Sequence, residues 1–557
     1  MIKLLSFTFV MSLIGFSSFG QPAIRSFELL NNKVHEYEKS DWSINISIPF
    51  MNPYDQKEIS LDMILTSPAG HPIVLPCYFE SVDQTASTWK ARFAPQETGK
   101  YSYCFHITTK LKSEESKTGS FISQAGSKPG FLHKNGLYTF RFDNGDLFRG
   151  IGENVAWESR AFENSKWTYD YILPTLSKNG ANFFRTWMCP WNLPLEWKNS
   201  GNLKRYANTD EYFNPDGVKR MDELVHLTDS LGLYFMLTLD MNKGDWNRSS
   251  YNQINGGPVK TWPEFFSSPA AMQKYKDKLR YLVARWGYST SIAAWEFFNE
   301  IDNGVFGKED TILIPLSSVT QWHNEMGRYL KDIDPYQHLV TTSISHRDIT
   351  GLNSIAYIDF NQKHIYKHTE KIPAIYADYI QTYGKPYVIG EFGYRWEDQD
   401  TRYAKEADFD YKRGLWYGMF SPTPILPMSW WWELFDDQKM TSYFKGVREI
   451  SDLMLKAGQG SFTSFAVSAD IVHTQGMKCG DKYFVYLLNN SNSEVTTNVS
   501  FTTNKDINIL VQFFTPDNRQ YSSSSDFVLT AKRVMLNNVK VESKKELVII
   551  VTVNSKR

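Results

Sequence analysis

The chain has 557 residues, a length that allows several domains with separate hydrophobic cores. Lysine and arginine (60) nearly balance aspartate and glutamate (61), and no basic block interrupts the sequence, so the electrostatic signature of a nucleic-acid-binding protein is missing. Its four cysteines show no paired Cys/His spacing, so we expect neither a metal site nor a cofactor.

The first twenty residues predict a secretory signal peptide. Lys3 precedes an apolar run that ends at the small residues Ser17, Ser18 and Gly20, and this run is too short to span a membrane. We expect cleavage near Gly20. No later segment approaches the length of a membrane span, so the sequence predicts an exported protein, which would be periplasmic, attached to the cell surface or extracellular.

Residues 21–125 predict an immunoglobulin-like β-sandwich. Apolar and polar residues alternate along 42–50 and 101–107, and Asn52-Pro53 supplies a turn between such runs. Cys77 and Cys104 each lie within a strand-like run and could be joined by a disulfide in an oxidising compartment. Residues 126–130 then predict a linker.

Residues 131–457 alternate between strand-like and helical patterns, which predicts a (β/α)8 TIM barrel. From about 460 to 557 the pattern is again all-β, so the predicted architecture is a multidomain chain in which the barrel is flanked by two β-sandwich domains. Amphipathic helices are expected at 167–178, 216–231, 270–286 and 318–333. The eight expected strands are 149–157, 182–188, 233–240, 291–300, 338–343, 358–366, 385–393 and 426–433.

Two of the expected strands end in glutamates, Glu300 and Glu391, and the first carries Asn299 directly before its acid. Catalytic residues of such barrels lie at the carboxyl ends of the strands. The two acids are 91 residues apart, close to the roughly 93 residues that three βα units of such a barrel occupy. We therefore expect Glu300 and Glu391 to face each other, with Glu296 lying deeper as a buried support.

A carboxyl pair of this kind suits the hydrolysis of glycosidic bonds with retention of configuration. Glu300 would be the acid/base and Glu391 the nucleophile, while the Asn299 amide would hold the sugar 2-hydroxyl. Asp240 ends the third strand and could bind a sugar hydroxyl. Trp187 is expected either as a stacking platform or as packing at the rim.

Two segments carry a family resemblance. Trp-Glu-Phe-Phe-Asn-Glu (295–300) and Val-Ile-Gly-Glu-Phe-Gly (388–393) resemble the acid/base and nucleophile strands of clan A glycoside hydrolases, of which glycoside hydrolase family 5 is the best known. The resemblance covers residues 140–455. Ile301 stands where family 5 usually has proline, so the resemblance is to the clan rather than to one family.

The resemblance also implies roles for further residues. Arg185 matches the arginine that supports the nucleophile, although an arginine here would equally fit a buried ion pair. His364 and Tyr366 match a His-x-Tyr pattern whose tyrosine bonds the nucleophile. The run 430–432 is similar to the strand that bears the aromatic platform under the reacting sugar, and strand alternation would place Trp430 and Trp432 on one face.

The sequence therefore predicts a secreted retaining β-glycoside hydrolase that acts on a polysaccharide or its oligosaccharides by double displacement. The alternative is a non-catalytic carbohydrate-binding protein on a degenerate glycosidase barrel. Such a binder would need aromatic side chains but no acid/base pair. The sequence identifies neither the sugar nor the linkage.

Overall fold

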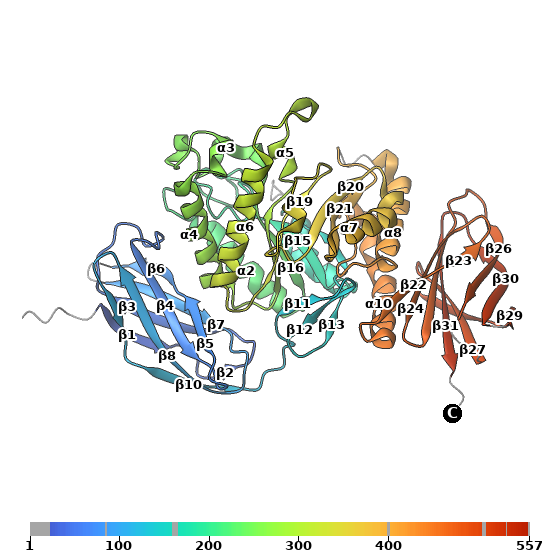
Figure 1. Ribbon diagram of the computed structural model, residues 1–557, viewed down its shortest axis with the longest axis horizontal. Coiled ribbons are helices and arrows are strands. Elements are labelled where there is room, and N and C mark those ends of the chain that lie inside the picture. Colours follow the sequence, from blue (N-terminus) through green and yellow to red (C-terminus); the bar gives the residue numbers. More distant parts are fainter. Residues whose placement is uncertain are drawn as a thin grey trace, which may run out of the picture.

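A computed structural model of the chain describes residues 23–83, 86–158, 165–397, 401–503, 508–530 and 532–554. Figure 1 shows β-sheets at either end of the molecule and a central region of strands and helices between them. The expected signal peptide lies outside the described residues. Among the described helices, none combines the length and apolar character that crossing a membrane requires.

The N-terminal region packs two sheets face to face around one core. The first has the strand order β1-β3-β7-β6, and the second has the order β2-β10-β8-β4-β5 with β9 paired to β8. Buried and partly exposed residues alternate along β3 and β4, as expected for strands with one face on a core. The strands are β1 (Ile24–Leu29), β2 (Val34–His35), β3 (Ser40–Ile46), β4 (Ile59–Thr66), β5 (Pro72–Pro76), β6 (Tyr78–Val82), β7 (Ser87–Phe93), β8 (Gly99–Thr109), β9 (Ser113–Glu115) and β10 (Gly119–Gln124).

The disulfide considered between Cys77 and Cys104 is not formed, because both thiols are free. Cys104 lies on β8 opposite Ile64 of β4, whereas Cys77 follows β5, which pairs with the other edge of β4. Strand β4 therefore lies between the two cysteines. Sequence spacing alone could not reveal this intervening strand.

Parallel strands form a ring at the centre of the molecule. They run in the orders β14-β15-β16-β17-β18 and β19-β20-β21, and parallel bridges from Ser429 to Glu153 and to Phe392 join the first strand to the last. The segment around Ser429 thus completes the ring. The strands are β14 (Gly152–Asn154), β15 (Phe183–Trp187), β16 (Tyr234–Asp240), β17 (Ile292–Phe298), β18 (Leu339–Thr341), β19 (Ser343–Ile344), β20 (Asn361–Tyr366) and β21 (Tyr387–Gly393).

Helices cover the outside of this ring (Figure 1). Local sequence signals set their ends: the Asn214 side chain accepts hydrogen bonds from the first turn of α2, Pro215 begins the helix, and Gly232 ends it with a φ of 63°. The helices are α1 (Tyr169–Lys178), α2 (Pro215–Leu231), α3 (Trp262–Phe265), α4 (Pro269–Trp286), α5 (Asp302–Val305), α6 (Leu316–Ile333), α7 (Ile372–Tyr383), α8 (Ala404–Met419), α9 (Trp432–Asp437) and α10 (Phe444–Gly458).

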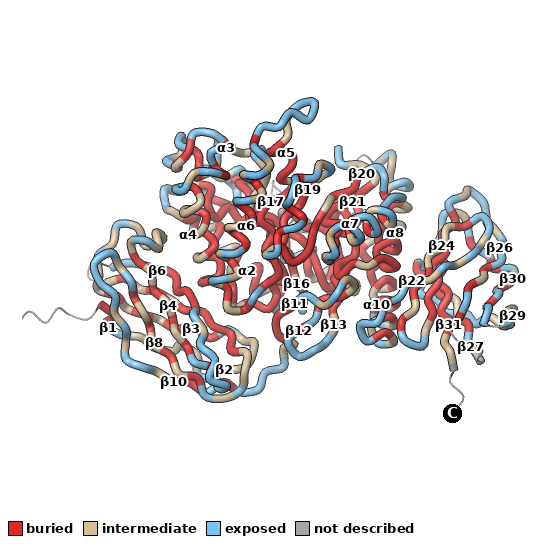
Figure 2. Tube along the Cα trace, in the orientation of Figure 1, coloured by how far each residue is buried: buried red, intermediate tan, exposed pale blue. Residues whose placement is uncertain are grey.

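A small antiparallel sheet closes the end of the ring at which the strands begin. Its strands are β11 (Leu132–Asn135), β12 (Thr139–Phe142) and β13 (Leu147–Phe148). Phe140 and Phe148 of this sheet share a buried cluster with Val388 and Met428 from inside the ring. Figure 2 shows the strands of the ring buried along most of their length. The opposite end, where the strands finish, is left for a functional site.

The C-terminal region again packs two sheets, and one of them lies against α8 and α10. Trp416 of α8 stacks on Tyr486 with ring centroids 5.8 Å apart, so this sheet shares its core with the central region. The sheet orders are β22-β24-β25-β31-β27-β28 and β23-β26-β30-β29. The strands are β22 (Phe462–Phe465), β23 (Val467–Ala469), β24 (His473–Cys479), β25 (Lys482–Leu488), β26 (Val495–Thr502), β27 (Asn508–Thr515), β28 (Gln520–Ser524), β29 (Phe527–Thr530), β30 (Arg533–Val541) and β31 (Glu546–Asn554).

Candidate active site

Glu300 lies in a sharp turn directly after β17. Its backbone has a φ of 48°, a left-handed conformation that is uncommon outside glycine, and its N–H donates to Ser343 Oγ at 2.9 Å. The next N–H, of Ile301, donates to the Ser343 carbonyl at 3.0 Å. These two bonds to the neighbouring strand β19 hold the turn and place the Glu300 carboxyl at the mouth of the ring.

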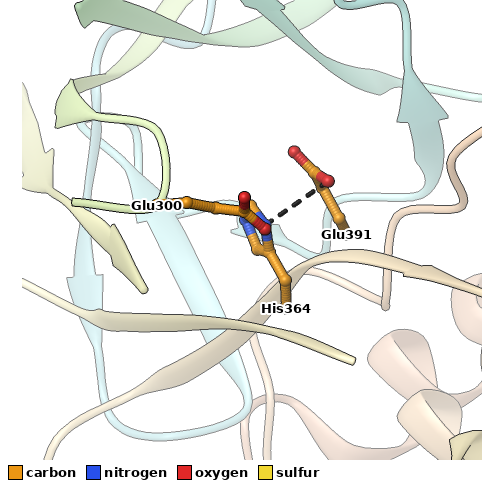
Figure 3. Close-up of side chains that lie close together, drawn as sticks. All are labelled: Glu300, His364 and Glu391. Carbon is orange, nitrogen blue, oxygen red and sulfur yellow. Dashed lines mark hydrogen bonds and ion pairs between the residues drawn. The ribbon is translucent and has the colours of Figure 1, made fainter. Parts of the chain in front are cut away.

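Glu391 faces Glu300 from β21, with His364 of β20 between them (Figure 3). One oxygen of each carboxyl group and the His364 ring nitrogen all lie within 4.8 Å of one another. His364 Nδ1 is 2.8 Å from Glu300 Oε1 and 3.4 Å from Glu391 Oε2. Retaining glycosidases hold their two carboxyl groups about 5–5.5 Å apart, so this spacing fits that chemistry.

Arg185 of β15 is fully buried beneath the pair and links the predicted residues. Its guanidinium donates to Glu391 Oε1 at 2.7 Å, to Asn299 Oδ1 at 2.7 Å and, through two nitrogens, to Glu296 at 2.7 and 2.9 Å. Glu296 has no exposed surface. The structure thus places Glu296 in the deeper, supporting position expected for it, while Arg185 contacts Glu391 directly.

Tyr366 holds the second oxygen of Glu391. Its hydroxyl donates to Glu391 Oε2 at 2.6 Å, so both oxygens of this carboxyl group accept a strong hydrogen bond. Burial lowers the pKa of His364 to about 4, and the negative charge of Glu391 only partly opposes this fall. His364 is therefore a neutral imidazole at pH 7.

The two carboxyl groups differ in their surroundings. Burial, followed by the nearby charge of Asp302, raises the pKa of Glu300 to about 7. Burial also raises the pKa of Glu391, but the Arg185 guanidinium opposes this rise and Tyr366 donates to the carboxylate. Because two acids this close rarely ionise together, we expect Glu391 to be the ionised member and Glu300 the protonated one near neutral pH.

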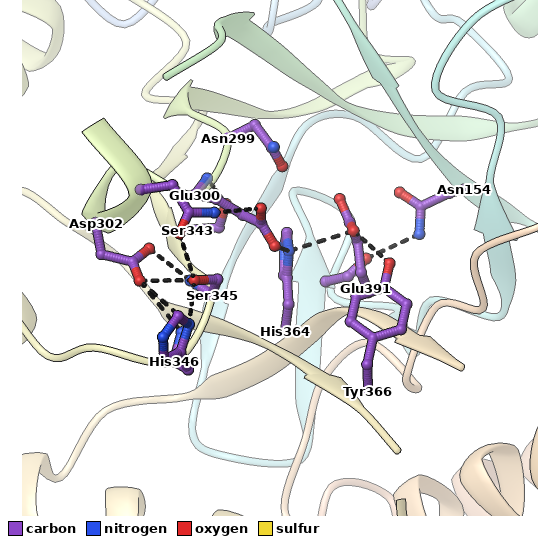
Figure 4. Close-up of polar contacts among 12 residues, drawn as sticks. Asn154, Asn299, Glu300, Asp302, Ser343, Ser345, His346, His364, Tyr366 and Glu391 are labelled. Atoms are coloured by element: carbon purple, nitrogen blue, oxygen red, sulfur yellow. Dashed lines mark hydrogen bonds and ion pairs between the residues drawn. The ribbon is translucent and has the colours of Figure 1, made fainter. Parts of the chain in front are cut away.

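Polar residues that sequence reasoning missed surround Glu300 (Figure 4). Asn303 Nδ2 donates to Glu300 Oε2 at 2.8 Å. Asp302, fully buried, accepts from Ser345 N and Ser345 Oγ, both at 2.7 Å. The signal in the sequence was the polar pair Asp302-Asn303, which begins two residues after the acid. Across the site, Asn154 Oδ1 accepts from Arg185 at 3.1 Å.

A cavity of about 670 Å³ opens over the two carboxyl groups. Trp187 and Trp430 line it, and their rings lie 5.5 Å apart. Asn299 lines it as well, and because its Oδ1 accepts from Arg185, its Nδ2 amide is left as a donor for a ligand. The cavity is large enough for sugar rings and combines apolar walls with a few polar groups.

Two predicted residues lie elsewhere. Trp432 does not line the cavity and begins helix α9, so the expectation that it shares a face with Trp430 is wrong. The reason is Trp431, whose φ of 62° turns the chain out of strand geometry. Asp240 is also absent from the cavity lining and accepts from buried Lys278 Nζ at 2.8 Å. It forms a buried ion pair rather than a sugar contact.

The Glu300, His364 and Glu391 donor atoms are also close enough to bind a metal ion. Their present partners fit such an ion poorly. Arg185 and Tyr366 donate to the two oxygens of Glu391, and a guanidinium beside the site adds positive charge where a cation would sit. The arrangement suits a pair of reacting carboxyl groups better than a metal centre.

Comparison with known proteins gives matches in two regions. Residues 33–108 match the model of a domain of unknown function, DUF5060. The mannan endo-1,4-beta-mannosidase A of Hypocrea jecorina is 26% identical over 273 residues, which cover 43% of this chain and 59% of that enzyme. The enzyme of the same name from Podospora anserina is 23% identical over 273 residues, covering 44% of this chain and 69% of that one. The chain spans 64% and 57% of the length of two further curated relatives from Aspergillus terreus.

A solved structure matches across nearly the whole molecule. A Bacteroides vulgatus protein assigned as a glycoside hydrolase superposes with a TM-score of 0.67 and covers 94% of this chain and 100% of its own. At 14% identity this match concerns the fold alone. In sequence and in fold, therefore, the chain resembles the glycoside hydrolases of clan A, as its two glutamate strands predict.

Proposed function

We propose that the protein is an exported, retaining β-glycoside hydrolase whose (β/α)8 barrel is flanked by two β-sandwich domains. The observation that carries this proposal is the pair Glu300 and Glu391, with carboxyl oxygens within 4.8 Å of each other at the mouth of the ring. The closed order of parallel strands supports the barrel, and the all-β sheets on either side support the two sandwiches.

In the first step, the Glu391 carboxylate attacks the anomeric carbon of the sugar while Glu300 gives its proton to the departing glycosidic oxygen. The bond to the leaving group breaks and a covalent glycosyl–Glu391 ester forms. Arg185 and Tyr366 hold the Glu391 oxygens in place for this attack. The raised pKa of Glu300, about 7, keeps the proton available near neutral pH.

In the second step, Glu300 is a carboxylate and removes a proton from a water molecule. That water attacks the anomeric carbon, the ester bond to Glu391 breaks, and the free sugar leaves with its configuration retained. The Asn299 amide would bond the sugar 2-hydroxyl, a contact that strengthens in the transition state. Trp430 and Trp187 would supply the aromatic walls for the reacting sugar.

The substrate we propose is a polysaccharide or an oligosaccharide derived from it. The relatives named above carry the name mannan endo-1,4-beta-mannosidase, which makes β-mannan a natural first substrate to test. The chain covers only part of those enzymes. The cavity walls beyond the two glutamates decide which sugar fits.

A panel of 2-deoxy-2-fluoro-β-glycosyl fluorides tests the proposal, because the fluorine slows the second step and traps the ester on the nucleophile. We expect one sugar of the panel to add its mass to the protein, with peptide mapping placing it on Glu391. Glu391→Ala should take up no label. Glu300→Gln should still be labelled, since fluoride leaves without an acid, but should not turn over natural glycans.

The alternative, a carbohydrate-binding protein without catalysis, gives the opposite pattern. Glycans would bind to the unchanged chain, no fluoride would label it, and Glu391→Ala would bind glycans as well as the parent does. That combination would overturn the hydrolase proposal. Thermal unfolding of each variant establishes that the comparison is between folded proteins.

A further inference from the structure

The cavity over the two glutamates carries an excess of positive charge. Apart from Glu300 and Glu391, the charged side chains among its described lining residues are Lys363, Lys367 and Lys371. The chain as a whole has a formal net charge of −1, so this excess is local and does not follow from composition. Clefts lined by one sign of charge concentrate ligands of the opposite sign.

The three lysines are not equivalent. Lys363 Nζ donates to the Tyr379 hydroxyl at 2.8 Å and lies 3.9 Å from Asp348, so it is committed to the wall of the ring. Lys371 is exposed at the start of α7, and no ion pair with another described residue holds it. Lys371 is therefore the cation most open to a ligand.

Lys367 lies beside the nucleophile strand. It directly follows Tyr366, and its backbone N–H donates to the carbonyl of Gly393 at the end of β21. Its side chain is half exposed and pairs with Glu397. Because an exposed ion pair contributes little, Lys367 can exchange Glu397 for an anion of the substrate at small cost.

An exposed aromatic ring completes this wall. Trp396 lines the cavity and is 59% exposed, and the Lys367 ammonium lies 6.0 Å from the centre of its ring. A large apolar ring that borders a cleft and stays in water marks a place where a ligand packs. An aromatic ring beside two lysines suits a sugar that carries a negative group, because the sugar ring stacks on the aromatic ring and the negative group pairs with the lysines.

We propose that the substrate is an anionic glycan whose carboxylate or sulfate ester binds Lys367 and Lys371 while one of its sugars stacks on Trp396. This inference rests on the proposed hydrolase function in one respect. That function sets the direction in which the glycan enters the cavity, so that the charged sugar lies near Glu391. It separates the protein from its relatives named for mannan, a chain without charge.

Binding to matched pairs of glycans tests the inference. The Glu300→Gln variant, which should bind substrate without cleaving it, is titrated calorimetrically with acidic oligosaccharides and with neutral derivatives of the same backbone. β-1,4-Mannuronate oligomers are compared with their carboxyl-reduced forms, and sulfated galactan oligomers with their desulfated forms. We expect at least one acidic member to bind more tightly than its neutral partner, and the series that does so identifies carboxylate or sulfate as the recognised group.

Substitutions then locate the contact. In the same background, Lys367→Gln and Lys371→Gln should each weaken binding of the acidic ligand by about ten-fold and leave the neutral partner unchanged. Lys219→Gln, an exposed lysine on α2, is the matched control and should change neither. Added salt should weaken acidic binding alone. Trp396→Ala should weaken both members of the pair, because it removes stacking rather than charge.

Equal binding of every acidic ligand and its neutral partner would overturn the inference, as would acidic binding that survives both lysine substitutions. Neither result touches the hydrolase proposal, which the fluoride label on Glu391 decides when the panel of fluorides holds uronosyl as well as neutral sugars. Conversely, lysine-dependent binding in a chain that takes no fluoride label would retain the anion subsite and reject the hydrolase.

Discussion

A single carboxylate, Asp302, acts through its charge on Glu300, the acid/base that we propose. It is fully buried two residues from Glu300 and accepts from backbone and side-chain donors of the loop that carries Ser345 and His346. After burial, its negative charge is the main reason why the pKa of Glu300 rises to about 7. An acid that must donate a proton loses activity as the pH rises through that value.

We therefore expect Asp302→Asn to move the alkaline limb of the kcat/KM profile to lower pH, by about one unit, because the like charge that disfavours ionised Glu300 is gone. The profile is measured with an aryl β-glycoside whose poor leaving group needs the acid. Asp310→Asn, which removes an exposed carboxylate from the same region, should leave the limb in place. An unmoved limb in folded Asp302→Asn would show that Asp302 does not set the pKa of Glu300.

At the scale of elements, side chains pointing into the ring connect neighbouring strands. Arg185 on β15 meets Asn154 of β14, while Glu296 of β17 accepts from both Arg185 and Thr238 of β16. A buried ion pair of this kind is weak evidence for stability, because removing both charges is often harmless. Its role would then be to position Glu391 and Asn299.

Substitutions of the pair separate these two roles. Arg185→Met leaves Glu296 charged and buried, so we expect it to destabilise the barrel by about 3–5 kcal/mol. The double variant Arg185→Met/Glu296→Met should recover most of that loss, seen as a thermal unfolding midpoint near the parent's. Its kcat should nevertheless fall about a hundred-fold or more, since Glu391 is no longer held in place. Near-parental kcat in the double variant would assign Arg185 a structural role only.

The elements also explain how far the sequence could lead. Apolar runs that end in a polar residue indicated β17 and β21, because the buried part of a strand and its solvent end differ in composition. The turn at Trp431 left no such signal, since a left-handed tryptophan is set by its surroundings and not by local propensity. The partner of Asp240 was equally hidden, because Lys278 comes from α4, 38 residues further along the chain.

At the scale of the whole molecule, the central region and the C-terminal sheets meet at a buried junction. Glu546, at the start of β31, is buried beside this junction, where Lys412 of α8 bonds Asp517 at 2.8 Å. Burial raises the pKa of Glu546 to about 8, and Lys412, already paired with Asp517, only partly offsets this rise. At pH values below about 8 the folded protein therefore keeps Glu546 protonated, whereas in the unfolded chain Glu546 has the pKa of an ordinary glutamate.

The pH dependence of stability follows from this difference. Between about pH 4.3, where an unperturbed glutamate ionises, and about pH 8, the folded state binds a proton that the unfolded state has lost. The contribution of Glu546 to stability is fully present below that range and falls by about 1.4 kcal/mol for each pH unit within it.

We expect Glu546→Gln to lack this pH-dependent contribution, so that its unfolding midpoint rises relative to the parent's as the pH increases from 5 to 8. Glu542→Gln, an exposed neighbour, should follow the parent throughout. Parallel curves for the parent and Glu546→Gln would show that Glu546 is ionised at the junction.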